Sequence, residues 1–218
     1  MILEDLIRRL FYGRKKEEKA AATQKVLDDP ILREVIPAKL QNNALLRLAI
    51  EISEQVSDLE ETMQEIETSE KVTDEELAEI DELIEAIELI RQQKHKLSVT
   101  LSEVCYRICK RIIKDDYRMA LCMQALGESQ LTLGRPKLCL PPLKEAVDVF
   151  EEEEDWTRAA ACYGNMGVAW RRLGDIEAAA DYFQRALKTA EESGDELLVK
   201  RTEQWIKDFA SGALPLEE

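Results

Sequence analysis

Residues 160–195 read AACYGNMGVAWRRLGDIEAAADYFQRALKTAEESGD, and residues 120–155 align with them at a constant offset of 40. The aligned pairs are Leu126/Met166, Gly127/Gly167, Leu133/Leu173, Gly134/Gly174, Leu143/Phe183, Ala146/Ala186 and Asp155/Asp195. Asp115 lies one period further upstream at the position of Asp155. Self-similarity at a fixed period of this length indicates stacked supersecondary units, each too small to bury its hydrophobic face alone.

The composition around this repeat is typical of helices. Charged residues make up 34% of the chain and aromatic residues 6%, a balance that favours long helices over sheets, so we expect an all-α fold. We expect an antiparallel, coiled-coil-like helical hairpin packed on a short α-solenoid that ends in a capping helix. The expected divisions are 1–42 (N-terminal amphipathic and short helices), 43–113 (acidic helical hairpin), 114–212 (repeats with a capping helix) and 213–218 (tail).

Two heptad-like series of apolar residues predict the hairpin. The first is Ala49, Ile52, Val56, Leu59, Met63 and Ile66; the second is Ile80, Leu83, Ile87, Ile90, Lys94, Leu97, Leu101, Val104 and Ile108. Thr73 and Glu76 have the spacing of a capping box at the start of the second helix. We expect this helix to continue without interruption toward Ile113 and to break at Asp115-Asp116. Lys94 is a polar residue in the apolar series, where it would set the register, and dimerisation through this series is left open.

The formal charge of −15 is concentrated in one part of the chain. Residues 51–90 contain sixteen acidic side chains and one basic side chain, Lys71, so the rest of the chain is nearly neutral. Such a segment disfavours nucleic acid and anionic membranes as partners and favours basic protein partners. A solvated helical face that keeps the protein soluble is the alternative interpretation.

Residues 2–11 form a short amphipathic pattern that precedes the basic cluster 14–16. Contact with a membrane surface through this segment is one interpretation, and packing against the body of the protein or a disordered end is the favoured one. No apolar run approaches the length of about 20 residues that spans a bilayer, and Glu4 and Asp5 interrupt the N-terminal apolar stretch. We therefore expect a cytoplasmic protein.

The second copy of the repeat has small and large residues at regular positions. In chain order they are Tyr163, Met166, Gly167, Trp170, Gly174, Ala179, Phe183 and Ala186. Gly167 and Ala179 are small where two helices would cross closely, and Gly174 suits the left-handed conformation that ends a helix. This pattern resembles the tetratricopeptide repeat, a helix–turn–helix unit, in its 40-residue variant.

The resemblance covers about residues 117–210. The first copy is more degenerate, since Gln130 and Cys139 stand where an aromatic residue and an alanine are usual. Pro141 and Pro142 predict a kink or a late start of its second helix. The last helix, Glu196–Phe209, has no second half, and we expect it to cap the stack.

The resemblance implies that the first helix of each unit lines a concave surface that binds an extended or helical peptide of a partner protein. The candidate residues on that surface are Leu121, Gln124, Glu128, Leu131, Ala161, Gly164, Val168, Arg171 and Arg172. Family members that hold chaperone C-termini present Lys, Asn and Arg there, whereas Gln124, Glu128, Gly164 and Val168 of this chain lack such cations. Arg171 and Arg172 are the one basic spot on the candidate surface. The implied function is an adaptor or scaffold; a dedicated secretion-type chaperone and a membrane-recruited tether are the alternatives.

Motifs that carry chemistry are not found in the sequence. His95 stands between Lys94 and Lys96 with no orienting partner, and neither a phosphate-binding loop nor a nucleophile elbow occurs. Cys105 and Cys109 lie one helical turn apart and could bind a soft metal with a third ligand, but structural zinc sites use four ligands. We therefore expect no enzyme activity, no cofactor and no metal.

Overall fold

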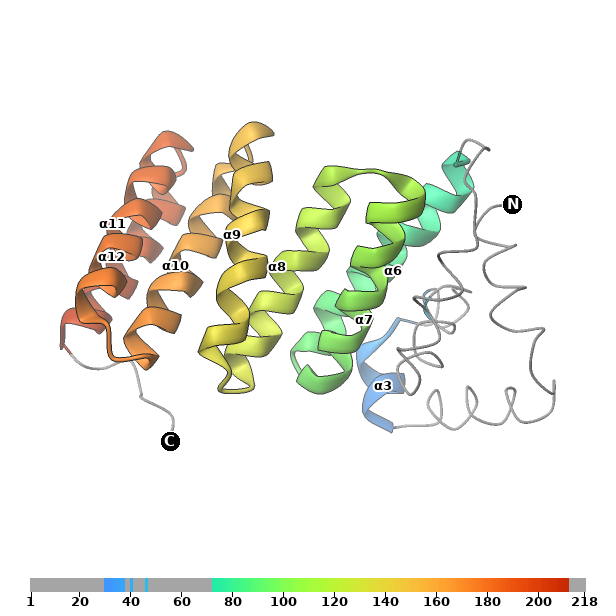
Figure 1. Cartoon of the computed structure of the whole chain (residues 1–218), viewed down its shortest axis with the longest axis horizontal. Coiled ribbons are helices and arrows are strands. Elements are labelled where there is room, and N and C mark those ends of the chain that lie inside the picture. The colour runs from blue at the N-terminus through green and yellow to red at the C-terminus, as the bar shows by residue number, and fades with distance from the viewer. Residues whose placement is uncertain (1–29, 38–39, 41–45, 47–71, 212–218) are drawn as a thin grey trace. The chain divides into compact units, whose positions relative to one another are not determined.

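The computed structural model describes residues 30–37, 40, 46 and 72–211, and every regular element in these ranges is a helix, which confirms the all-α prediction. The elements are α3 (Pro30–Val35), α6 (Asp74–Arg91), α7 (His95–Ile108), the π-helix η2 (Cys109–Ile113), α8 (Asp116–Thr132), α9 (Pro136–Glu152), α10 (Trp156–Arg172), α11 (Ile176–Glu192) and α12 (Glu196–Ser211) (Figure 1). The predicted helices within residues 2–27 and the first apolar series, 49–66, lie outside the described residues.

The chain divides into two compact units, residues 1–125 and 126–218. The division falls within α8, after the predicted boundary between residues 113 and 114. In the first unit, the described core contains apolar residues of α6 and α7, among them Ile80, Leu83, Leu101 and Val104. Most of the second apolar series is therefore buried, as its spacing predicts.

A turn with a left-handed residue recurs every 20 residues along the chain. Gly134, Gly174 and Gly194 have φ angles of 70°, 85° and 68°, and Lys114 and Glu154 adopt φ angles of 56° and 57° at the two remaining positions. Glycine adopts this conformation without steric strain, whereas a residue with a Cβ atom is strained in it. The helices from α8 to α12 consequently begin at intervals of 20 residues, and the 40-residue repeat is a pair of such helices.

An aspartate follows the left-handed residue in four of these turns and caps the next helix. Asp155 Oδ1 accepts a hydrogen bond from the Arg158 amide at 3.1 Å, and Asp175 Oδ1 accepts one from the Ala178 amide at 2.9 Å. Asp115 caps α8 in the same way, so the break predicted at Asp115-Asp116 is confirmed. The spacing of these aspartates in the sequence therefore reports the helix N-termini, where carboxylates satisfy free amides.

The predicted capping box at Thr73 and Glu76 is present at the N-terminus of α6. The Thr73 hydroxyl accepts from the Glu76 amide at 3.2 Å, and the Glu76 carboxylate accepts from the Thr73 amide at 2.8 Å. The prediction that this helix continues to Ile113 is wrong. The chain turns at residues 92–94, and Lys94 is the N-cap of α7 with φ −130° and ψ 65°. A polar residue in an apolar series marked a turn here, because turn residues remain near water.

Helix α9 begins at Pro136 and includes Pro141 and Pro142, so the late start proposed for this helix is wrong. Proline is well suited to the first helical position because the amide there has no partner within the helix. Pro141 and Pro142 lie further along and remove two backbone donors. The N-terminal part of α9 therefore has fewer backbone hydrogen bonds than a regular helix of its length.

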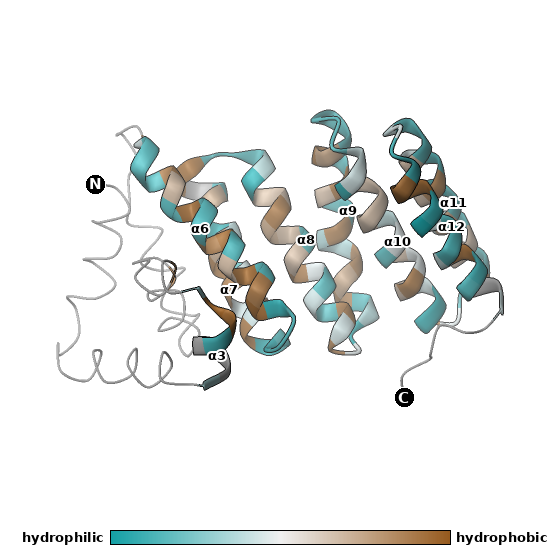
Figure 2. Cartoon of the chain, turned by 180° about the vertical axis from the view of Figure 1, so that it is seen from behind, coloured by the Kyte–Doolittle hydropathy of each residue, from teal (hydrophilic) through white to brown (hydrophobic). Residues whose placement is uncertain are grey.

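Glycines allow close packing between the helices of the second unit. A Cβ atom on Gly127 would lie 2.5 Å from Cγ of Leu143, and one on Gly167 would lie 3.0 Å from two atoms of the Phe183 ring. Phe150, Phe183 and Ala186 are buried in this unit. Figure 2 shows hydrophobic and hydrophilic residues mixed along each labelled helix from α6 to α12. None of the described helices has the length and apolar composition needed to cross a bilayer.

Candidate partner-binding surface of the repeats

The residues predicted to line the partner-binding surface lie on two helices, as expected. Helix α8 carries Leu121, Gln124, Glu128 and Leu131, and α10 carries Ala161, Gly164, Val168, Arg171 and Arg172. Gln124 and Leu131 are 6% and 7% exposed, so a partner could reach little of either side chain. Leu121, Glu128, Ala161, Val168, Arg171 and Arg172 are partly buried.

Gly164 is covered by a residue outside the candidate surface. A Cβ atom on Gly164 would lie 2.5 Å and 2.8 Å from two ring atoms of Trp205, which belongs to α12. The glycine thus provides the space into which the indole packs, and it is buried. The sequence offered no signal for this contact, because helix periodicity does not relate residues on different helices.

Trp205 is itself only partly buried, and one face of its ring is close to a cation. The guanidinium carbon of Arg201 lies 5.8 Å from the ring centroid, within the range of cation–π attraction. Arg201 is exposed. Helix α12 therefore contributes an aromatic side chain and a positive charge beside α10.

Two polar contacts connect the C-terminal part of α8 with α10. Asn165 Nδ2 donates to Oε1 of Glu128 at 3.1 Å, and Arg172 Nη1 donates to the carbonyl oxygen of Leu131 at 2.5 Å. A cation at the C-terminal end of a helix also interacts favourably with the helix dipole. Glu128 and Arg172 therefore stabilise the unit, and a change at either would disturb packing as well as any partner.

Tyr163 of α10 forms a hydrogen bond with α9 and a ring contact with α11. The Tyr163 hydroxyl donates to Oε1 of Glu151 at 2.8 Å, and the Tyr163 and Tyr182 rings lie 6.3 Å apart between centroids. Burial raises the pKa of Tyr163, and the hydrogen bond to Glu151 raises it further. The phenol therefore stays protonated and acts as a donor that orients the ring between the helices.

Among the residues that the structure describes, one group that could hold a metal lies in the first unit and consists of cysteines. The sequence placed Cys105 and Cys109 on one helix face without a third ligand. In the structure, Cys122 of α8 joins them, and the three sulfur atoms lie within 4.8 Å of one another. The remaining cysteines, Cys139 and Cys162, are buried in the repeat helices α9 and α10.

Comparison with known proteins supports the resemblance predicted from the repeat. No curated protein and no solved structure matches the chain. A family model does match: it covers the turn before α9, the helices α9 and α10, and the whole of α11. That model describes the tetratricopeptide repeat, and residues 133–192 of this chain match it.

Proposed function

We propose that this chain is a non-enzymatic adaptor or scaffold in which the repeats bind a peptide or helix of a partner protein. The observation that carries the proposal is the tetratricopeptide match over residues 133–192, because repeats of this kind mediate protein–protein interaction. The regular spacing of α8 to α12 supports it, since stacked helix pairs form extended binding surfaces.

The proposed contact surface centres on three residues of α10: Ala161, Val168 and Arg171. These three are partly buried, whereas Gly164 lies under Trp205 and Arg172 donates to the backbone of α8. Ala161 and Val168 offer a small apolar area, and Arg171 offers a guanidinium that forms strong bonds to carboxylates. The best-fitting partner segment therefore combines an apolar side chain with an acidic one.

A second contact, with a basic partner, is proposed for α6. This helix carries eight acidic residues and a single basic one, Arg91. Several of the acids are already engaged within the protein: Glu76 caps the helix, Glu88 pairs with Arg91, and Asp81 pairs with Arg118. The exposed acids Asp74 and Glu75 are the proposed contact points for a basic segment.

The test of the repeat surface is a selection of peptides against the intact chain. A displayed library of random 16-residue peptides would be enriched on the native protein, and the selected peptides would be measured by fluorescence anisotropy. We expect Val168→Glu and Arg171→Glu to weaken binding at least tenfold, a change of about 1.4 kcal/mol. Circular dichroism would verify that both variants keep their helix content.

The matched control is Lys188→Glu on α11, which makes the same charge change as Arg171→Glu at a side chain that is 78% exposed. We expect it to leave the affinity unchanged. If no peptide is enriched, or if the three variants bind as the native chain does, the repeats do not bind peptides through α10.

A further inference from the structure

Three cysteine thiols meet in the described part of the first unit. Cys105 lies on α7, Cys109 begins η2, and Cys122 lies on α8. Each is at most 1% exposed, all are free thiols, and their sulfur atoms lie within 4.8 Å of one another. We propose that Cys105, Cys109 and Cys122 form a binding site for one thiophilic metal ion, with three-coordinate Cu(I) as the best-fitting ion.

The distances suit a metal better than a disulfide. With metal–sulfur bonds of about 2.3 Å, three sulfurs in a plane around one ion lie about 4 Å from one another. Separations of up to 4.8 Å therefore need to contract by less than 1 Å, which small side-chain rotations provide. A disulfide joins two sulfurs at about 2.05 Å and would leave the third cysteine out.

The ligand set selects the ion. Thiolates are soft ligands that favour Cu(I), zinc and iron–sulfur clusters over harder ions. Structural zinc and iron–sulfur clusters take four protein ligands. Among the residues that the structure describes, no histidine, carboxylate or further cysteine joins these three sulfurs. An ion that is stable with three thiolates therefore fits this group, and Cu(I) is such an ion.

The backbone around Cys109 is unusual in a way that fits a binding site. Residues 109–113 form a π-helix, and the Lys114 amide donates to the Cys109 carbonyl at 2.6 Å. Such wide turns are rare and are often found at functional sites. Here the π-helix ends at Lys114, whose left-handed conformation reverses the chain into α8. The reversal brings Cys122 beside Cys105 and Cys109.

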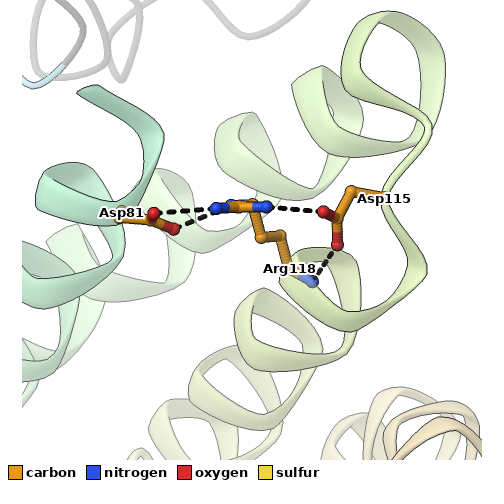
Figure 3. A network of polar contacts seen from close by, with 3 residues as sticks. All are labelled: Asp81, Asp115 and Arg118. Carbon is orange, nitrogen blue, oxygen red and sulfur yellow. Dashed lines mark hydrogen bonds and ion pairs between the residues drawn. The ribbon is translucent and has the colours of Figure 1, made fainter. Parts of the chain in front are cut away.

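The three thiols interact with one another and with charged neighbours. Hydrogen bonds from Cys105 and Cys122 lower the pKa of Cys109, whereas hydrogen bonds to Cys109 and Cys122 raise the pKa of Cys105, and burial raises the pKa of Cys122. Arg118 lowers the pKa of Cys109, and Asp115 raises it. The Arg118 guanidinium lies between two carboxylates, with bonds of 2.7 Å and 2.8 Å to Asp81 and of 2.6 Å to Asp115 (Figure 3). Metal binding would release the thiol protons.

The competing interpretation is that three small buried thiols merely fill space. The double variant Cys139→Ala/Cys162→Ala distinguishes the two, because it retains only the three clustered cysteines of the five in the chain. The reduced intact protein would be titrated anaerobically with Cu(I) against a chromophoric Cu(I) chelator. We expect the double variant, like the native chain, to remove one Cu(I) per chain from the chelator. X-ray absorption should then show three sulfur neighbours.

Single variants of the cluster complete the test. Cys105→Ala, Cys109→Ala and Cys122→Ala should each weaken Cu(I) binding at least tenfold, with helix content checked by circular dichroism. If a single variant fails to fold, the double variant still decides the question, because every cysteine thiol in it belongs to the cluster. Failure of the double variant to compete for Cu(I), or coordination by fewer than three sulfurs, would overturn the proposal.

Discussion

The two copies of the 40-residue repeat differ in how closely they follow the local rules of helix formation. In the second copy, Gly194 occupies the left-handed position after α11, and the position equivalent to Pro141 in α9 is Asp181 in α11. In the first copy, Glu154 occupies a left-handed position after α9, and Pro141 and Pro142 lie inside that helix. Both copies nevertheless form two 17-residue helices. Packing of the buried residues therefore compensates for residues that locally disfavour the helix or the turn.

The largest effect is expected where both copies bury a large side chain against a glycine. Phe183 is 1% exposed and packs on Gly167, while Leu143 is 0% exposed and packs on Gly127. We expect Phe183→Ala to lower the free energy of unfolding by about 3–5 kcal/mol and Leu143→Ala by about 2–5 kcal/mol, because each leaves a cavity. Urea unfolding followed by circular dichroism measures both. The control is Gln184→Ala at an exposed neighbour, which should leave the free energy of unfolding nearly unchanged. If Phe183→Ala had an equally small effect, the core would not depend on this ring.

An exchange of proline between the copies should have the next largest effect. Asp181→Pro would remove a backbone donor in α11 and is expected to destabilise the protein by about 3 kcal/mol. The reverse change, Pro141→Asp, restores a donor in α9 and should stabilise the protein. The same urea titration compares them, with Asp181→Ala as the control for loss of the carboxylate. If Asp181→Pro were neutral, the amide at this helix position would make no net contribution in either copy.

Substitutions at the glycines where helices cross closely should change stability by an intermediate amount and should differ between the copies. Gly127→Ala would force the buried Leu143 side chain to move and would approach the Cys139 carbonyl oxygen, which lies 3.2 Å from the added atom. We expect a loss of about 1–3 kcal/mol from overpacking. Gly167→Ala meets the Phe183 ring at 3.0–3.1 Å and should cost less, because this contact is longer than the 2.5 Å contact at Gly127. The helix preference of alanine favours both variants equally. Thermal unfolding of the two variants tests the order, and a more stable Gly127→Ala would contradict it.

The smallest effect is expected at the turns. Glu154 is exposed and holds a φ angle of 57°, so Glu154→Gly should stabilise the protein by about 0.5–1 kcal/mol. Gly174→Ala should destabilise it by a similar amount, since a Cβ atom there meets nothing within 4 Å and only the backbone conformation is strained. Melting temperatures of both variants would be compared. Changes of the same sign at the two sites would show that the turns differ in more than their central residue.

Much of the fold was predictable because its determinants are local. The left-handed Gly174, the break at Asp115-Asp116 and the capping box at Thr73 each depend on residues within four positions, and each was predicted correctly from the sequence. The candidate surface was less predictable. Helix periodicity placed Gly164 on the binding face, but it cannot show that Trp205, far along the chain, covers that glycine.

The sequence by itself determined the helical class, the 40-residue repeat and the positions of most helix ends, because periodicity and capping depend on residues close together in the chain. Tertiary structure alone decided two further matters. It interrupted the apolar series at Lys94 with a turn, because the residues after it form a separate helix whose apolar side chains are buried beside those of α6. It also brought Cys122 to Cys105 and Cys109, since contacts between helices depend on how the chain reverses at Lys114.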